Sequence, residues 1–302
     1  MIKYIKQEEI DKEKWDKCLE NSDNGLVYAY SFYLDAMSKK WDALVAGDYE
    51  QIMPLAWNRK YGISYLYQPP FCAQLGIFGN NISKEIVRSF LESVPKKFKY
   101  WDFYLNKSNL FLIEEYPIYE RSNFVLPLNN SYENLSKNYA QSHLRNIKRA
   151  IKQENYVKKD IPLEDVIGLA KAQSQQFSNL SDLDYTNFLE AFTHLKNKNS
   201  ACTLGVFSKR NQLMASCAFI FSHSRAYYIL VGNHPDGRTS GASHLMIDYF
   251  IKEYSGKDLL LDFEGSSISS LAFFYKSFGA TQENFAGIKV NRLSAIARLF
   301  RQ

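Results

Sequence analysis

The feature that most constrains the fold is an internal similarity between the two halves of the chain. Residues 43–54 (ALVAGDYEQIMP) resemble residues 204–215 (LGVFSKRNQLMA). In both segments two apolar runs flank a short polar turn, which is the pattern of a β-hairpin. Similarity at a fixed separation is typical of a repeated structural unit. We therefore predict that one α/β unit occurs twice in tandem.

Each hairpin is followed by an aromatic strand, a helix and a further strand, in the same order. The strands are expected at 65–67 and 226–230, the helices at 84–94 and 240–254, and the last strands at 99–103 and 259–263. This order predicts the fold class α/β (α+β), with a mixed, mostly antiparallel sheet flanked by helices in each domain. The expected boundaries are 1–130, a linking helix within 131–159, and 160–302.

The connector 131–153 has the pattern of an amphipathic helix. One face is apolar, with Leu135, Tyr139, Leu144, Ile147 and Ile151, and the rest is basic, with Arg145, Lys148, Arg149 and Lys152. The basic residues fit either a phosphate-facing surface or the solvated side of a linking helix. Two more helices are expected at 163–177 and 185–196.

A turn between a buried strand and a helix is the strongest candidate for a binding site. Residues 231–242 (VGNHPDGRTSGA) join the apolar run 226–230 to the helix that begins near Ser240. Small residues and Arg238 at a helix start point backbone N–H groups and the positive end of the helix dipole toward an anion. The turn therefore predicts a donor that bears phosphate.

Composition and charge exclude several classes of protein. The apolar content of 46% and charged content of 23% are typical of a folded soluble domain. A net charge of +5 suits a phosphorylated small molecule and is too mild for a dedicated binder of duplex DNA. The N-terminus has no apolar signal core, and the longest apolar-rich run, 213–221, is too short to span a membrane.

The cysteines and histidines give no metal signature. The four cysteines lack CxxC spacing and fit buried thiols of a reducing compartment, so a cytoplasmic location is expected. The histidines never pair at metal-ligand spacing, and we expect no metal. They are His143, His194, His223, His234 and His244.

The order of hairpin, strand, phosphate turn, helix, strand and helix resembles the GNAT acyltransferase fold. Residues 238–243 (RTSGAS) are similar to the pyrophosphate loop of that superfamily, Arg/Gln-x-x-Gly-x-Gly/Ala, with Ser243 in place of the last small residue. The resemblance implies that this loop binds the donor phosphates. Its residues are Arg238, Thr239, Ser240, Gly241, Ala242 and Ser243.

Several further segments resemble the Fem-type branch of this superfamily. They are 261–265 (LDFEG), 274–280 (FYKSFGA), 142–150 (SHLRNIKRA) and 67–78 (YQPPFCAQLGIF). That branch consists of tandem-GNAT proteins, with nonribosomal peptidyltransferases that extend peptidoglycan precursors and related BioF2-like acetyltransferases. The long coiled-coil arm of some Fem-type proteins has no counterpart here, because no sustained heptad pattern occurs.

The resemblance places the candidate catalytic residues near the end of the chain. Asp262 and Glu264 lie two apart on a predicted strand, so they share a face and could take a proton from an acceptor ammonium. Alternatively, they cap the next helix or pair with Lys276. Tyr275 fits a general acid for the leaving group or a core aromatic, although it lies one residue closer to Phe278-Gly279 than the acid of ordinary GNAT enzymes. Lys276 fits an oxyanion or phosphate ligand, or a surface lysine.

The first half has no counterpart of Arg238, which indicates that it lost the donor site and forms the acceptor side. The candidate substrate-binding residues are Lys39, Trp41, Tyr67, Gln68 and Gln74.

Three functions remain open. The first is an N-acyltransferase that uses acyl-CoA, such as acetyl-CoA, and no metal to acylate an amine of a small molecule or cell-wall precursor. The second is a Fem-type peptidyltransferase that takes its donor from aminoacyl-tRNA and acts on a peptidoglycan precursor. The third is a non-catalytic GNAT scaffold that binds a metabolite or a partner.

Overall fold

The computed structural model describes residues 1–174, 180–265 and 267–293. Contacts divide the chain into two compact units. Unit 1 consists of Met1–Arg121 together with the segment that begins at Asn284, and unit 2 consists of Ser122–Glu283. This division differs from the expected boundaries, because the connector 131–159 lies inside unit 2 and the last strand passes into unit 1.

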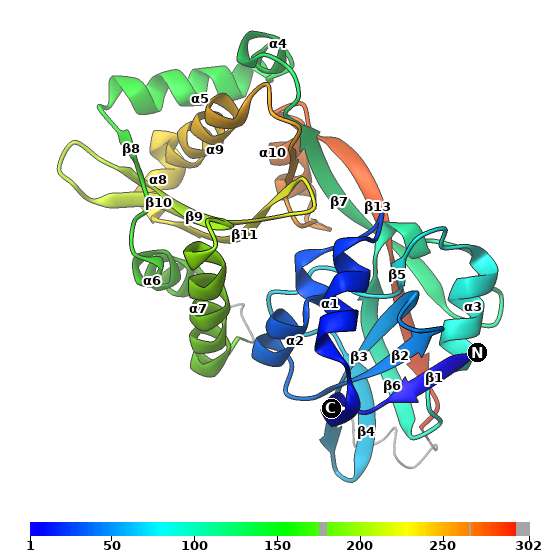
Figure 1. Cartoon of the computed structure of the whole chain (residues 1–302). Helices are drawn as coiled ribbons and strands as arrows, with labels where there is room; N and C mark the ends of the chain where they lie inside the picture. The colour runs from blue at the N-terminus through cyan, green and yellow to red at the C-terminus, as the bar shows by residue number, and fades with distance from the viewer. Residues whose placement is uncertain (175–179, 266, 294–302) are drawn as a thin grey trace. The chain divides into compact units, whose positions relative to one another are not determined.

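Unit 1 alternates strands with short helices (Figure 1). Its strands are β1 (Ile2–Ile5), β2 (Trp41–Ala46), β3 (Gln51–Lys60), β4 (Ile63–Tyr67), β5 (Phe78–Gly79) and β6 (Phe98–Leu105). Its helices are η1 (Gln7–Glu9), α1 (Lys12–Glu20), η2 (Val27–Ala29), α2 (Ser31–Met37), α3 (Lys84–Glu92) and η3 (Lys107–Asn109). Strand β7 (Ile118–Pro127) leads from unit 1 into unit 2.

Unit 2 begins with the connector, which forms α4 (Tyr132–Ser136) and α5 (Gln141–Lys152) instead of one helix. The next elements are β8 (Tyr156–Lys159), α6 (Leu163–Ser174), α7 (Asp182–Asn197), β9 (Ala201–Phe207), β10 (Leu213–Ser222) and β11 (Arg225–Asn233). The last are α8 (Pro235–Ser240), α9 (Ala242–Tyr254), β12 (Leu260–Asp262) and α10 (Ser269–Lys276), and β13 (Thr281–Asn291) returns to unit 1. Of the helix expected at 163–177, residues 175–177 lie outside the described residues.

The two units have the same strand order. In unit 1 it is β1-β2-β3-β4-β6-β13, and in unit 2 it is β8-β9-β10-β11-β12-β7. The pairs β4–β6 and β11–β12 are parallel, whereas the other pairs within these rows are antiparallel. A mixed, mostly antiparallel sheet flanked by helices is thus confirmed.

Helices cover both faces of the sheet in unit 1. Trp41 and Leu44 lie three residues apart on β2, so their side chains point to opposite faces. Trp41 packs against Trp15 of α1, with ring centroids 5.0 Å apart. Leu44 belongs to the core that also contains Phe90 and Leu91 of α3. This double cover explains why strand residues on both faces are fully buried.

Helices α6 and α9 cover the sheet of unit 2 from opposite sides (Figure 1). Phe250 of α9 stacks on Phe219 of β10, with ring centroids 3.8 Å apart. On the other side α6 lies so close to Gly232 of β11 that an added Cβ would lie 2.6 Å from the backbone nitrogen of Ala170. This tight packing fixes the course of β11 toward the phosphate turn.

Candidate functional site

The parallel strand pair has the same register in both units. Tyr67 lies opposite Asp102 in unit 1, and Tyr227 lies opposite Asp262 in unit 2. In each unit the aspartate is followed by a buried phenylalanine, Phe103 or Phe263. The parallel pairing ends at these Tyr–Asp positions in both units. The two units therefore differ in the chain segments beyond the paired strand ends.

In unit 1 the chain after β4 fills the edge of β6. The side-chain oxygen of Gln68 accepts a hydrogen bond from the Tyr104 N–H at 2.9 Å, and the Leu75 N–H donates to the Tyr104 carbonyl at 3.0 Å. Three buried asparagines hold this loop, because each donates to the carbonyl of Ile77. They are Asn24, Asn106 and Asn109, at 2.9, 3.0 and 3.1 Å. The end of the parallel pair is thus closed by protein.

In unit 2 the longer strand, β11, continues past the end of β12 while it stays paired with β10. Strand β12 ends at Asp262, while β11 runs on from Tyr228 to Asn233 without a partner on β12. A β-bulge occurs in this part, because Ala218 pairs with Leu230 and Phe219 with Tyr228, which leaves Ile229 as an extra residue. Bulges interrupt ladder pairing and are frequent beside active sites. The edge of β11 is thus the candidate position for an extended ligand.

The predicted phosphate turn is more helical than its sequence indicates. Pro235 begins the short helix α8, which His234 caps by accepting from the Asp236 N–H. Thr239 and Ser240 lie in its last turn, and their hydroxyls donate to backbone carbonyls three residues earlier, at 3.0 and 3.1 Å. The side chain of Arg238 lies outside the described part of the structure. Its expected contact with phosphate stays a prediction.

Gly241 joins α8 to α9 in a left-handed conformation, with φ +83°. The close neighbour of Gly241 is α5, because an added Cβ would lie 2.3 Å from the carbonyl oxygen of Asn146. Gly237 is packed equally tightly, because a Cβ added there would lie 2.0 Å from the carbonyl oxygen of Met214. Both glycines are therefore needed for packing within unit 2, whether or not they also contact a ligand.

The basic face of α5 lies beside this turn. Arg149 donates to the Thr239 carbonyl at 2.9 Å and also to the side chain of Asn146. Arg145, Lys148, Arg149 and Lys152 are exposed and follow an i, i+3, i+4, i+7 stripe. Two segments that the sequence singled out separately, the basic connector and the phosphate turn, thus meet in unit 2. Ile151 is exposed instead of buried, since His143, Ile147 and Ala150 form the inner face of α5.

At the start of α9, Ala242 is fully buried and Ser243 makes an internal hydrogen bond. Its hydroxyl donates to the side chain of Asn233, the last residue of β11. Gln173 of α6 accepts from the Asn233 N–H at 2.6 Å. Ser243, which departs from the small residue of the family loop, therefore ties α9 to the end of β11.

Asp262 is a structural carboxylate. It is 2% exposed, and its Oδ2 accepts from Arg225 at 2.5 Å. Its Oδ1 accepts from the side chain of Asn123 and from the Glu264 N–H, both at 2.8 Å. The expectation that Asp262 and Glu264 share a strand face is wrong, because the strand ends at Asp262 and Glu264 adopts φ +60°. The cationic partner of Asp262 is Arg225, which the sequence did not single out, and not Lys276.

Tyr275 lies near Glu264 in an aromatic cluster. Its ring stacks on Phe263 with centroids 4.3 Å apart, and it is 7% exposed. Burial and the Glu264 carboxylate raise the pKa of Tyr275. The phenol therefore stays protonated at neutral pH. Lys276 is exposed at the end of α10, with its ammonium 5.3 Å from the ring centroid of Phe124.

The predicted substrate residues of unit 1 lie close together, and two of them are in contact. The Tyr67 hydroxyl accepts from the Lys39 N–H at 3.1 Å. Trp41 is fully buried and donates to Asp35 at 2.9 Å, so it has no surface to offer a ligand. Gln68 holds the loop after β4, and Gln74 is 4% exposed. A binding role for Lys39, Tyr67, Gln68 and Gln74 stays a prediction.

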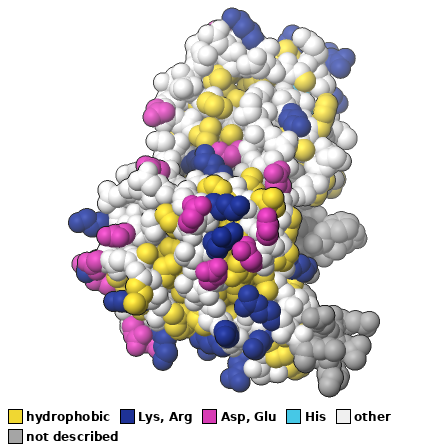
Figure 2. Space-filling view, turned by 90° about the vertical axis from the view of Figure 1, so that its right-hand side faces the viewer, with side chains coloured by type: hydrophobic (Ala, Val, Ile, Leu, Met, Phe, Trp, Pro, Cys, Tyr) yellow, Lys and Arg dark blue, Asp and Glu magenta, His cyan; other side chains and the backbone are white. Residues whose placement is uncertain are grey.

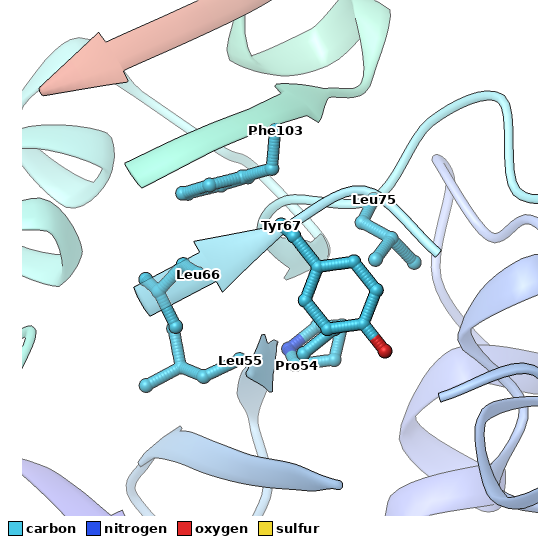
Figure 3. Close-up of a pocket in the computed structure, with 7 residues that line it drawn as sticks. Pro54, Leu55, Leu66, Tyr67, Leu75 and Phe103 are labelled. Atoms are coloured by element: carbon cyan, nitrogen blue, oxygen red, sulfur yellow. The ribbon is translucent and has the colours of Figure 1, made fainter. Parts of the chain in front are cut away.

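Tyr67 also lines a small apolar cavity that has no room for a water molecule (Figure 3). Its other lining residues carry no polar side chain. They are Pro54, Leu55, Ala56, Leu66, Leu75 and Phe103. The cavity lies where the parallel pair of unit 1 ends, and Leu75 of the closing loop forms part of its wall.

Two histidines that are distant in the sequence form a pair in unit 2. The rings of His143 on α5 and His244 on α9 lie 4.5 Å apart. The Nε2 of His143 donates to the Phe274 carbonyl at 3.0 Å, and that of His244 lies 3.0 Å from the Asn146 amide nitrogen. Within the described residues neither Nδ1 has a partner. Burial first, then the charges of His143 and Arg149, lower the pKa of His244 to about 3.

Three general properties of the described residues bear on what the chain can bind: surface charge, metal-binding groups and the length of apolar helices. On the face drawn in Figure 2, basic side chains are interspersed with acidic and apolar ones. Among the residues that the structure describes, no three His, Cys, Asp or Glu side chains are grouped to hold a metal. No helix in the described ranges is both long and apolar enough to cross a lipid bilayer.

Comparisons with known proteins place the fold. No protein-family profile matches the sequence, and no curated protein resembles it by sequence. The structure is similar to that of FemX, with a TM-score of 0.64 and 14% identity over 97% of this chain and 99% of that chain. It also resembles a conserved protein of unknown function from Bacteroides thetaiotaomicron (TM-score 0.61, 12% identity, 95% and 99% covered).

A third similar structure is the C-terminal domain of a putative lysylphosphatidylglycerol synthetase from Agrobacterium fabrum. Its TM-score is 0.59, at 10% identity, and the match covers 96% of this chain and 94% of that chain. At such identities the likeness shows the fold. The FemX-like fold that the sequence motifs implied is therefore confirmed.

The packing of Gly241 against α5 generates a prediction with a matched control. Gly256 also has positive φ, +78°, but no atom lies within 4 Å of an added Cβ. Gly256→Ala should therefore lower the free energy of unfolding by about 1–2 kcal/mol, the cost of left-handed backbone alone. Gly241→Ala should cost at least about 3 kcal/mol, because Asn146 must also move. Urea unfolding measures both, and equal losses would contradict the α5 contact.

The buried histidine pair predicts a dependence of stability on pH. His244 is protonated in the unfolded chain below about pH 6.5, its ordinary value, but in the folded chain only near pH 3. The free energy of unfolding should therefore fall as the pH drops through this window, by up to about 1.4 kcal/mol per pH unit from this group. His244→Phe should make the fall shallower by about 1 kcal/mol per unit.

The control for this pH dependence is His194→Gln, on the exposed end of α7, which should leave the slope unchanged. Urea unfolding between pH 6.5 and pH 4 measures the three proteins. A His244→Phe protein with the slope of the wild type would show that His244 is not the buried neutral group.

Proposed function

We propose that the chain transfers an acyl group from a phosphate-bearing donor to an amine. The donor of the proposal is acyl-CoA, such as acetyl-CoA, and the acceptor is an amine of a small molecule or a cell-wall precursor. The observation that supports it best is the end of the parallel pair in unit 2, where β11 runs on past the last residue of β12. Glu264 and Tyr275 lie near this strand end, whereas in unit 1 a loop bonds to β6 at the same position.

The reaction needs groups that polarise the acyl carbonyl, groups that accept and supply protons, and groups that bind the donor phosphates. The acceptor ammonium loses one proton to a base, and its nitrogen then attacks the acyl carbon of the thioester. The carbon–sulfur bond breaks, and the leaving thiolate takes the second proton from nitrogen, which yields an amide and a free thiol. In this proposal, backbone N–H groups near the bulge at Ile229 polarise the carbonyl.

The remaining residues have roles in the same proposal. Glu264 is the base, because Asp262 is fully engaged by Arg225, Asn123 and the Glu264 N–H. The raised pKa of Tyr275 keeps its phenol protonated, so it can pass its proton to the leaving thiolate and take up the second proton of the nitrogen in return. The phosphates lie at the start of α9, near Arg238, Ala242 and Ser243. In the same proposal, Lys276 is a ligand for developing negative charge.

The test is amine-dependent release of free thiol. The purified chain is incubated with acetyl-CoA and a panel of primary amines, and thiol and amide are quantified together. We expect the two products in equal amounts, with rates that rise with donor concentration to saturation. Binding of acetyl-CoA by calorimetry without any product would favour the non-catalytic scaffold. If acetyl-CoA neither binds nor yields product, acyl-CoA is excluded as the donor.

Aminoacyl-tRNA is the second candidate donor, and two observations favour it. The exposed cationic stripe of α5 lies beside the phosphate turn, where it could follow a nucleic-acid backbone. The fold is also similar to that of FemX and of the C-terminal domain of a putative lysylphosphatidylglycerol synthetase. The ester of an aminoacyl-tRNA undergoes the same attack, with a ribose oxygen as the leaving group.

Charge reversal on α5 separates the two donors. Arg145 and Lys148 are exposed on the outer side of α5, so their substitution leaves its buried face intact. If tRNA binds there, Arg145→Glu with Lys148→Glu should weaken binding and lower the salt slope by roughly 1 per lost phosphate contact. The matched control reverses Lys196 and Lys198 at the end of α7, which are also exposed. An equal effect of both double variants on filter binding would contradict an α5 site.

A further inference from the structure

Arg225 is a buried cation at the start of β11, between two carboxylates. Its side chain is 8% exposed and reaches Asp262 at 2.5 Å and Glu283 at 3.0 Å. Removing three charged groups from water is costly, and such groups are often no more stabilising than apolar residues of the same size. This arrangement therefore calls for an explanation beyond stability.

The ion pair between Arg225 and Asp262 fixes the backbone at Glu264, two residues after Asp262. Arg225 holds one oxygen of Asp262, so the other oxygen is oriented toward the Glu264 N–H, which it binds at 2.8 Å. Asn123 of β7 binds the same oxygen at 2.8 Å and completes the fixation. Glu264 then adopts φ +60°, a conformation that is uncommon for a residue with a side chain.

Left-handed backbone at a residue other than glycine persists where the surroundings determine it, and it occurs often at functional sites. Here the determining groups are Asp262 and, behind it, Arg225. The direction of the Glu264 side chain follows from this backbone conformation. The Glu264 carboxylate is near enough to Tyr275 for its charge, after burial, to raise the pKa of the phenol.

We infer that Arg225 is a positioning residue for acyl transfer, which acts through Asp262 to hold Glu264 as the base that deprotonates the acceptor ammonium. The inference rests on the proposed function and divides the two strand-end carboxylates into different roles. Asp262 is the anchor, and Glu264 exchanges the proton. The proton moves from the ammonium nitrogen to a Glu264 oxygen before the nitrogen attacks the acyl carbon, and no other bond changes in that step.

Two acceptors of similar shape distinguish this role from a structural one. Phenethylamine is protonated at neutral pH and needs a base, whereas O-benzylhydroxylamine is neutral and does not. With acetyl-CoA as donor, Glu264→Gln should lower kcat for phenethylamine by about 100-fold and that for O-benzylhydroxylamine by less than about threefold. Arg225→Lys and Asp262→Asn should show the same selectivity, with about tenfold loss for phenethylamine.

Two further measurements complete the experiment. Melting temperatures verify that each variant is folded, and Glu253→Gln, in the exposed pair with Lys159, is the control that should leave both rates unchanged. Equal losses on both acceptors for Arg225→Lys and Asp262→Asn would overturn the positioning role and leave the proposed function standing. If the wild type acetylates neither acceptor, nor any amine of the panel, the proposed function and this role fall together.

Discussion

A backbone that leaves a β-ladder must find other partners for its N–H and C=O groups, and the two units meet this constraint in different ways. In unit 1 the side chain of Gln68 and the loop held by buried asparagines take over the edge of β6. In unit 2 β11 continues past the end of β12 while it stays paired with β10 across the bulge at Ile229, and Gln173 accepts from the N–H of Asn233 at its far end. One sheet design thus gives two strand ends with different surroundings. The strand end in unit 2 has Glu264 and Tyr275 beside it.

The fold was largely predictable, because it depends on local pattern and on similarity between the halves. Apolar spacing within short stretches of the sequence is enough to predict the hairpins and the main strands and helices. These include the strands near Tyr67 and Tyr227 and the helices near Val87 and Met246. Helix ends were less predictable. The turn at 235–240 is helical because Pro235 and the cap from His234 favour a first helical turn, and the connector breaks where the Ala140 N–H bonds to the Ser277 carbonyl.

The site was predictable as a list of residues but not as an arrangement. From the sequence alone Asp262 fits a catalytic base. Its partners Arg225 and Asn123 lie 37 and 139 positions away, so the sequence does not reveal that they bind its carboxylate. Gly241 illustrates a second limit, because a glycine signals that something approaches the backbone closely without identifying it. In this structure the approaching group is the carbonyl of Asn146. The pairing of His143 with His244 had no local signal, since it depends on how α5 packs on α9.

Strands β7 and β13 each begin in one unit and end in the other, which has a consequence for the order of folding. Unit 1 needs residues 286–291 to pair with β6, although β6 leaves the ribosome almost two hundred residues earlier. Its sheet stays incomplete during most of translation, whereas unit 2 can close around β7 as soon as β12 is made. The N-terminal unit is therefore the first to be synthesised and the last to be finished. Pairings that are so distant in sequence slow folding, and they expose a bare strand edge to aggregation until β13 is made.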